Sequence, residues 1–243
     1  GSLIARKLEN KFNVTLIDDK DYFEFTPGVP RTLIEPEHIK RIQKLHTHYL
    51  KKAKIVQDKV VDVTKNHVFT TKNKISYDYL AICSGSTYNK PFKECNTVSP
   101  NRASMLRDYN KALNNAERIL IVGGGTVGVE IASEIVTHYK NKDITIIQAK
   151  NTLLERQNKK ARDYAYNFLV KRGCKIIFNE SVIKNNKNFY LTDKNRKIKA
   201  DLVIFCTGIK TNFEFLTNNF SKSLDENSNK SHHNFLGLLS NFL

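Results

Sequence analysis

The chain has 243 residues, of which 40% are hydrophobic, and a formal net charge of +16. That length is enough for one large domain or two small ones with a real core. Its apolar runs are too short for a transmembrane span, and no signal peptide opens the chain. The four cysteines form no CxxC or CxxxxC pair, which disfavours a disulfide framework, a zinc site and a dithiol active site; they are Cys83, Cys95, Cys174 and Cys206.

The positive charge is spread along the chain rather than concentrated. Lysine and asparagine fill loops such as 184–187 and 194–199, and no arginine-rich cluster is interleaved with aromatic residues. This pattern is typical of a solvated surface and disfavours specific nucleic-acid binding. The cysteine usage favours a reducing compartment, so we expect a cytoplasmic protein.

Hydrophobic periodicity predicts α/β architecture in two successive units. The first unit is expected to contain a helix at 3–10, a strand at 13–18, an aromatic and proline-rich loop at 20–36, a helix at 37–53, and strands near 54–57, 60–64, 67–71 and 79–83. A helix near 102–115 leads to the second unit, with a strand at 118–122, helix 126–139, strand 143–148, helix 158–172, and strands near 174–178, 181–185, 188–192 and 201–206. The pattern weakens beyond Thr211, and no return strand is expected within 235–243.

One glycine motif carries most of the functional information. The run from Ile119 to Glu130 reads as an apolar strand, a GxGxxG turn and the start of a helix. This arrangement places the pyrophosphate of a dinucleotide on a helix N-terminus. We therefore predict a nucleotide-binding turn, although a purely structural glycine turn is the alternative; its predicted binding residues are Gly123, Gly125, Thr126, Val127 and Gly128.

The chain also repeats itself. Gly1 to Leu8 has the glycine and alanine spacing of Gly128 to Ile135, and Asp78 to Gly85 matches Asp201 to Gly208. Gly1 is then the third glycine of a first motif whose strand and first two glycines are absent. Alternatively, Gly1 and Ser2 are a non-native pair left by cloning, which still leaves the helix without its leading strand. The predicted division is 1–115, 116–215 and 216–243, with the first unit incomplete and unstable in isolation.

These stretches together resemble a known family. The matching segments are Val14 to Asp18, Asp21 to Gly28, Tyr77 to Ser86, Gly123 to Glu130, Leu153 to Arg156, Asp201 to Asn212 and Ser223 to Asn227. They are similar to two-dinucleotide flavoproteins of the apoptosis-inducing-factor-2 and ferroptosis-suppressor type, which are related to type II NADH dehydrogenases. The first phosphate-binding glycines, the later Gly-Asp segment and the C-terminal domain of that family are missing here.

The resemblance implies two Rossmann-like domains with FAD bound by 1–115, NAD(P)H bound by 116–215, and 216–243 returning toward the FAD domain. Hydride passes from NAD(P)H to FAD, and electrons go on to a quinone in many relatives. The quinone branch fits better than the disulfide reductases because the chain has no cysteine pair. An association with a mitochondrial or other membrane surface stays open. The alternatives are a basic effector that binds nucleic acid, and an inactive piece that retains only the NAD(P) module.

Several residues are candidate contacts to FAD. Asp18 ends the second strand of the first unit, where a carboxylate can accept the ribose hydroxyls of adenosine. Lys20 is either a partner of the pyrophosphate or a solvated lysine. By resemblance, the backbone of Val60 and the turn at Ser84 and Gly85 contact the adenine half of FAD. In the repeat, Gly1 is equivalent to Gly128 and Gly208 is equivalent to Gly85. The repeat therefore assigns Gly1 and Gly208 to the nucleotide sites as well.

Two further residues concern the nicotinamide nucleotide. Gln148 stands where Asp18 stands in the first unit, and a glutamine does not repel the 2′-phosphate of NADP as a carboxylate would. Because Lys150 could meet that phosphate, NADH and NADPH both stay open. Glu130 either favours the helix dipole or, as the resemblance implies, lies near the nicotinamide and flavin, and it is the predicted catalytic residue. No metal is predicted, since His46 and His48 cannot face the same ion.

Overall fold

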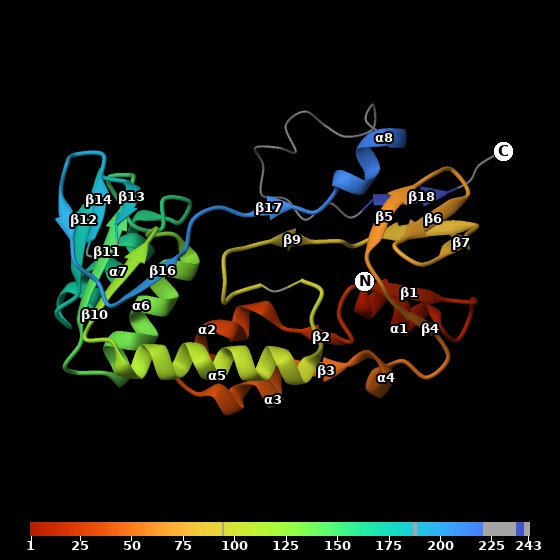
Figure 1. The fold of residues 1–243 in the computed structure, drawn as a ribbon, viewed down its shortest axis with the longest axis horizontal. Coiled ribbons are helices and arrows are strands. Elements are labelled where there is room, and N and C mark those ends of the chain that lie inside the picture. Colours follow the sequence, from red (N-terminus) through yellow and green to blue (C-terminus); the bar gives the residue numbers. More distant parts are fainter. Residues whose placement is uncertain (94, 187–188, 221–236, 241–243) are drawn as a thin grey trace.

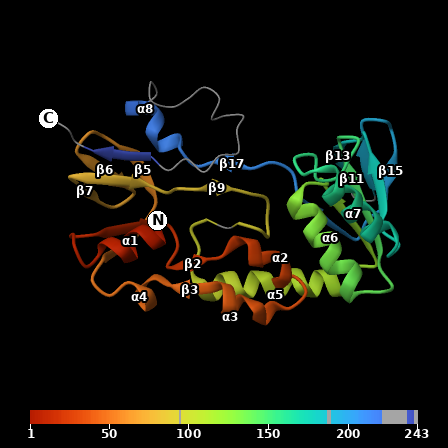
Figure 2. The ribbon, with the colours of Figure 1, turned by 180° about the vertical axis from the view of Figure 1, so that it is seen from behind.

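The structure is a computed structural model that describes residues 1–93, 95–186, 189–220 and 237–240. Two α/β lobes lie at opposite ends of the elongated molecule, and extended segments and a long helix join them (Figure 1). Figure 2 shows the same two lobes from behind. Within the described residues, no helix is long and apolar enough to cross a bilayer. The predicted α/β fold is confirmed.

The second lobe is built on a four-stranded parallel sheet with the order β12-β11-β10-β16. Two helices cover one of its faces and a small antiparallel sheet covers the other. The strands of the parallel sheet are β10 (Arg118–Val122), β11 (Asp143–Gln148), β12 (Lys175–Phe178) and β16 (Leu202–Phe205). The covering elements are α6 (Thr126–His138), α7 (Lys159–Val170), β13 (Val182–Asn186), β14 (Phe189–Thr192) and β15 (Lys197–Ile198).

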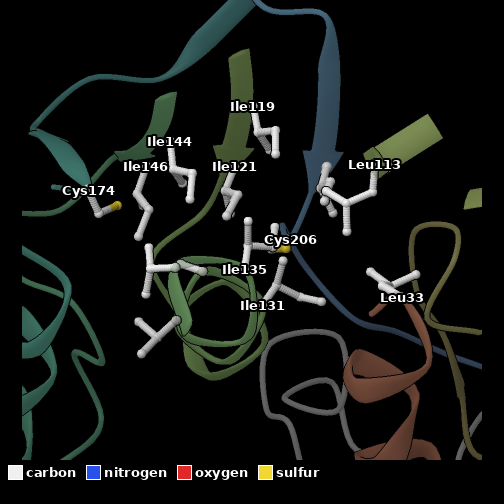
Figure 3. Packing of buried hydrophobic residues seen from close by; sticks show 14 of the residues in the cluster. Leu33, Leu113, Ile119, Ile121, Ile131, Ile135, Ile144, Ile146, Cys174 and Cys206 are labelled. Carbon is white, nitrogen blue, oxygen red and sulfur yellow. The ribbon is translucent and has the colours of Figure 1, made fainter. Parts of the chain in front are cut away.

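The apolar run of β10 is explained by burial on both faces. Side chains of a strand alternate between faces, so Ile119 and Ile121 pack toward the helices while Leu120 packs toward the antiparallel sheet. Figure 3 shows Ile119 and Ile121 above Ile131 and Ile135 of α6. All of these side chains are at most 1% exposed. Their burial makes this sheet the centre of the largest hydrophobic cluster in the described chain.

The first lobe has the same order of elements in smaller sheets. The helix α1 (Ser2–Leu8) leads to β1 (Thr15–Asp18), which pairs in parallel with β4 (Lys54–Gln57). An antiparallel sheet follows, and β8 pairs with a strand from the end of the chain. These strands are β5 (Val60–Val63), β6 (His67–Thr70), β7 (Lys74–Ser76), β8 (Tyr79–Ile82) and β18 (Gly237–Ser240).

The contacts of the two helix starts support the internal repeat. A Cβ added at Gly128 would lie 3.4 Å from the Cβ of Cys206, and one added at Gly1 would lie 3.3 Å from the Cβ of Cys83. The first residue of each matching segment therefore meets the cysteine that directly follows the equivalent strand. This geometry supports the assignment of Gly1 as the counterpart of Gly128.

Two sequence predictions are wrong. The helix predicted over 37–53 is broken by β3 (Gln43–Leu45), which pairs antiparallel with β2 (Tyr22–Glu24). Glu24 of β2 also forms a buried ion pair with Arg102, so tertiary contacts override the local helical pattern. The remainder of that stretch is η2 (Pro36–His38), α3 (Ile39–Ile42) and α4 (His46–Tyr49). A strand does occur within 235–243, since β18 pairs antiparallel with β8. The segment Ser223 to Asn227 lies outside the described residues.

Residues of the predicted first unit also pack on the second lobe. The long helix α5 (Ser99–Asn115) contributes Leu106 and Leu113 to the large cluster, and Leu33 joins it from the first unit. Arg31 donates to Glu134 of α6 at 2.8 Å. The remaining short elements are η1 (Thr26–Gly28), α2 (Val29–Thr32), β9 (Ser86–Thr87), β17 (Lys210–Thr211), η3 (Glu214–Leu216) and α8 (Thr217–Phe220).

Candidate functional site

The glycine turn between β10 and α6 has no room for an added side chain except at one position. Gly123 has a φ of +110°, and a Cβ there would lie 2.6 Å from the carbonyl oxygen of Cys206. A Cβ at Gly128 would lie 1.9 Å from the carbonyl oxygen of Gly123. Gly125 differs, because an added Cβ would meet nothing within 4 Å. Gly123 and Gly128 are therefore required by the fold, whereas Gly125 faces open space.

The N-terminus of α6 is suited to an anion. Gly125 is the N-cap residue, and it supplies no side-chain acceptor to the first amides of the helix. These amides belong to exposed Thr126 and half-buried Val127. The helix begins at the carboxyl end of β10, which is the edge where open parallel sheets bind ligands. Unsatisfied amides and the helix dipole favour a phosphate there.

Gln148 lies at the same edge but points back to the glycine turn. Its Oε1 accepts a hydrogen bond from the Gly124 amide at 2.9 Å, and its Nε2 lies 3.3 Å from the carbonyl oxygen of Thr152, to which it donates. The structure thus brings Gln148 to the predicted nucleotide edge. There its side chain is hydrogen-bonded to the protein itself, whereas Lys150 is exposed.

Glu130 lies on the first turns of α6 and is half-buried. Burial, assisted by the charge of Glu134, raises the pKa of its carboxyl above the usual value. This direction is that expected of a half-buried carboxyl, which holds its proton more tightly than one in water. The predicted catalytic role of Glu130 stays a prediction.

Asp18 ends β1 in a charged network. Burial opposes its ionisation, but the contact with His46 and the charge of Lys20 outweigh burial and hold the pKa of Asp18 at about 2. Asp18 Oδ1 lies 3.2 Å from Lys20 Nζ, and Oδ2 lies 3.4 Å from His46 Nε2. Oδ1 also accepts from the Lys20 amide at 3.0 Å. Because a carboxylate has about four acceptor positions, Asp18 keeps one for a ribose hydroxyl.

The contact with His46 is one that sequence reasoning missed. His46 is 2% exposed and its Nδ1 lies 2.6 Å from the hydroxyl of Tyr49. The only sequence signal was its spacing from His48, which concerns metal binding. The partnership with Asp18 depends on the pairing of β3 with β2, after which the His46 amide donates to the Asp21 carbonyl at 2.9 Å, and no local sequence pattern predicts that pairing.

A second missed residue is Lys93. It is half-buried, its Nζ donates to Ser86 Oγ at 2.6 Å, and the segment that carries it is tied to the first unit, since the Asn96 amide donates to Asp19 Oδ2 at 2.9 Å. Burial, followed by the charge of Lys20, lowers the pKa of Lys93. Lys20 itself is paired with Asp18 and Asp19. Among the described residues, Lys93 has no carboxylate within ion-pair distance, so it is the better cation for an anionic group.

The two predicted Ser/Thr-Gly turns lie at opposite ends of one antiparallel strand pair. Gly85 and Gly208 have φ values of +65° and +68° and begin the segments that contain β9 and β17. These strands pair antiparallel, and the Asn212 amide donates to the Gly85 carbonyl at 3.0 Å. We name the paired segments 84–87 and 210–212 the clasp; Figure 1 shows it crossing between the lobes. Val60 follows β4 in the first lobe and packs in a separate cluster with Ile17.

Two of the four cysteines are unsuited to redox exchange. All four are free thiols. Burial raises the pKa of Cys174 and Cys206 to about 12, so both stay protonated and unreactive at neutral pH. Cys83 is half-buried and Cys95 is exposed.

The chain was compared with known proteins. It is 30% identical to apoptosis-inducing factor homolog B of Dictyostelium discoideum (93% of this chain and 65% of the relative) and 28% identical to ferroptosis suppressor protein 1 of Homo sapiens (87% and 61%). It is also 26% identical to the external alternative NAD(P)H-ubiquinone oxidoreductase B3 of Arabidopsis thaliana (87% and 46%). The chain thus spans less than two thirds of the length of these relatives.

The fold matches solved structures as well. NDH2 from Plasmodium falciparum in complex with NADH superimposes with a TM-score of 0.70 at 21% identity, covering 86% of this chain and 53% of that one. A model of the pyridine nucleotide-disulphide oxidoreductase family matches residues 2–230. The resemblance stated from the sequence motifs is confirmed. The chain belongs to the pyridine nucleotide-disulphide oxidoreductase family.

Proposed function

We propose that this chain is the dinucleotide-binding part of an FAD-dependent NAD(P)H oxidoreductase that passes electrons to a quinone-like acceptor. The observation that carries the proposal is the uncapped start of α6 at Gly125, open to solvent at the carboxyl edge of a parallel sheet. The comparisons support the reaction class, since one relative is an NAD(P)H-ubiquinone oxidoreductase and one similar solved structure is a complex with NADH. The overall reaction is NAD(P)H plus quinone plus one proton giving NAD(P)⁺ plus quinol.

The chain's own residues bind and orient the nucleotides. The amides of Thr126 and Val127 would hold the pyrophosphate of NAD(P)H on the α6 N-terminus. In the first lobe, ionised Asp18 would accept a ribose hydroxyl of FAD, and Lys93 would supply the uncompensated positive charge. Bound FAD would accept the hydride, a step that needs no acid or base from the protein.

Glu130 would act by position. Its half-buried carboxyl lies on the first turns of α6, beyond the amides that would bind the pyrophosphate. Burial, followed by the charge of Glu134, raises the pKa of this carboxyl, so it holds a proton more tightly than a solvated glutamate does, and its protonated form can donate a hydrogen bond. We propose that it orients the reacting rings and limits water between them.

The cellular setting follows from the acceptor. Quinones are carried in membranes, so a quinone acceptor implies a cytoplasmic protein that reaches a mitochondrial or other membrane surface. Both NADH and NADPH are proposed donors, because the described end of β11 has no carboxylate that would repel a 2′-phosphate.

The test combines a visible absorption spectrum with one glycine variant. The purified full chain should show a flavin spectrum that bleaches with anaerobic NADH or NADPH. Gly125→Val should raise the Kd of ADP-ribose at least about 100-fold while the flavin spectrum is kept, because its side chain would occupy the phosphate space and its Cβ would meet no protein atom within 4 Å. Titration calorimetry and the spectrum measure the two effects.

Gly128→Ala is the matched control for folding. Its Cβ would lie 1.9 Å from a backbone oxygen, so we expect a loss of about 3 kcal/mol in the free energy of unfolding, whereas Gly125→Val keeps the wild-type value. Unchanged affinity for ADP-ribose in Gly125→Val would refute the assignment of the turn. A colourless chain that still binds ADP-ribose would restrict the function to the NAD(P) module.

A further inference from the structure

The side chain of Gln148 spans the gap between the glycine turn and the loop that follows β11. Its two polar ends are both engaged, with Oε1 accepting from the Gly124 amide at 2.9 Å and Nε2 donating to the Thr152 carbonyl at 3.3 Å. A Cβ built on Gly124 would lie 3.2 Å and 3.3 Å from the Cβ and Cγ of Gln148. The glutamine therefore lies flat along Gly124 instead of extending past the edge of the sheet.

Other contacts fix the same turn to the same loop. The Leu154 amide donates to the Gly124 carbonyl at 2.9 Å, and the Gly123 amide donates to the Ile147 carbonyl at 2.8 Å. A Cβ at Gly124 would also come within 2.5 Å of Leu153 Cδ2. Gly124 is thus held at its amide by a side chain and at its carbonyl by a backbone amide. These contacts at Gly124 fix the direction of the adjacent amides of α6, which have no side-chain cap.

We propose that Gln148 is a positioning residue that fixes the phosphate-binding turn and does not read the 2′ group of the nucleotide. The inference rests on the proposed function for NAD(P)H binding. A carboxylate at the end of the second strand usually binds the ribose of NAD, and here the glutamine makes two protein contacts in place of that contact. The first side chain beyond it that is both exposed and charged is Lys150.

The proposal separates two effects on affinity. Loss of the two Gln148 hydrogen bonds should weaken the binding of every ligand that carries the pyrophosphate, whether or not the ligand carries a 2′-phosphate. Loss of a residue that reads the 2′ group should change the ratio of the two affinities. ADP-ribose and 2′-phospho-ADP-ribose are suitable probes, because they contain the pyrophosphate and differ only at the 2′ position.

The experiment measures the Kd of both probes by calorimetry on the full chain and on Gln148→Met, which keeps the length of the side chain and loses both hydrogen bonds. We expect both Kd values to rise by the same factor, about tenfold. Lys150→Met is the matched variant, which should weaken only the 2′-phosphorylated probe, about threefold. Hydrogen exchange at the Gly124 amide supplies a readout without ligand, and it should be slow in the wild type and fast in Gln148→Met.

The results that would contradict this proposal can be told apart from those that would contradict the proposed function. A change of more than about threefold in the ratio of the two Kd values in Gln148→Met would assign the glutamine to the 2′ group and overturn the proposal. Unchanged Kd values, or equal exchange at Gly124 in the two chains, would overturn it as well. If the wild-type chain binds neither probe, the proposed function fails and the inference falls with it, although slow exchange at Gly124 would still be seen.

Discussion

Asp18 illustrates how one residue can be both a ligand candidate and a structural charge. Its carboxylate is stabilised by Lys20 and His46, which together outweigh the cost of burial. The same contacts restrict it, because most of its acceptor positions are taken before any ribose arrives. Its position at the end of β1 was predictable from the repeat, whereas its partners come from a neighbouring residue and from a distant segment.

The depressed pKa of Asp18 predicts a specific acid sensitivity. Folding lowers the pKa from 3.8 to about 2, so the unfolded chain binds the proton more readily. The contribution is fully present above about pH 4 and is lost as the pH falls through about 2, and it amounts to about 2 kcal/mol. Asp18→Asn should therefore flatten the fall in stability between about pH 5 and pH 2.

Urea unfolding across that pH range measures the effect. Asp78→Asn, at an exposed aspartate outside the network, is the control and should keep the wild-type slope. An Asp18→Asn chain whose stability falls as steeply as that of the wild type would show that the network contributes nothing.

At the scale of elements, the two long helices of the second lobe begin differently. The N-cap of α7 is Asn158, whose Oδ1 accepts from the Ala161 amide at 2.9 Å. The N-cap of α6 is Gly125, without a side-chain acceptor. The start of α7 is therefore capped by a side chain, whereas the start of α6 is not. This difference supports the proposal that the amides of α6 bind a ligand while those of α7 do not.

The closed start of α7 supports a stability prediction. Asn158→Ala should lower the free energy of unfolding by about 1 kcal/mol, because the Ala161 amide loses its acceptor. The Kd of ADP-ribose should stay unchanged, since α7 contributes no amide to the α6 start. Urea unfolding and calorimetry give the two values, and a chain as stable as the wild type would contradict the capping role.

Elements with a strong local signal were predictable, and those set by distant partners were not. The apolar run of β10 followed by the glycine turn identified β10, α6 and β11 from sequence alone. The stretch 37–53 looked helical, but Gln43 pairs with Glu24, whose own partner Arg102 is fully buried. Lys93 likewise carried no motif. Its place beside Ser86 depends on how the clasp is folded.

At the scale of the whole molecule, stability is uneven. The strand β10 is hydrogen-bonded on both sides and its residues Ile119 to Ile121 are at most 1% exposed. The strand β1 pairs only with β4 among the described residues, and its residues are all partly exposed. Parallel strands gain most of their stability from burial on both faces. The second lobe is therefore the more rigid part of the described chain.

This difference predicts the order of local opening. Backbone amides of β10 should exchange at least about 100-fold more slowly than those of β1, because opening β10 disrupts the large cluster. Hydrogen exchange followed by mass spectrometry on the full chain measures both strands together, with β11 as an internal reference. Equal exchange in β1 and β10 would mean that the two lobes unfold as one unit.

The clasp has a consequence for how the chain could be divided. Segments on either side of Tyr88 to Val98 are joined by the pairing of β9 with β17 and by the buried ion pair of Arg102 with Glu24. The peptide link in that stretch is thus one tie among several. Two polypeptides separated there would recognise each other through these contacts, so the molecule has the properties of a split protein that can reassemble from complementary halves.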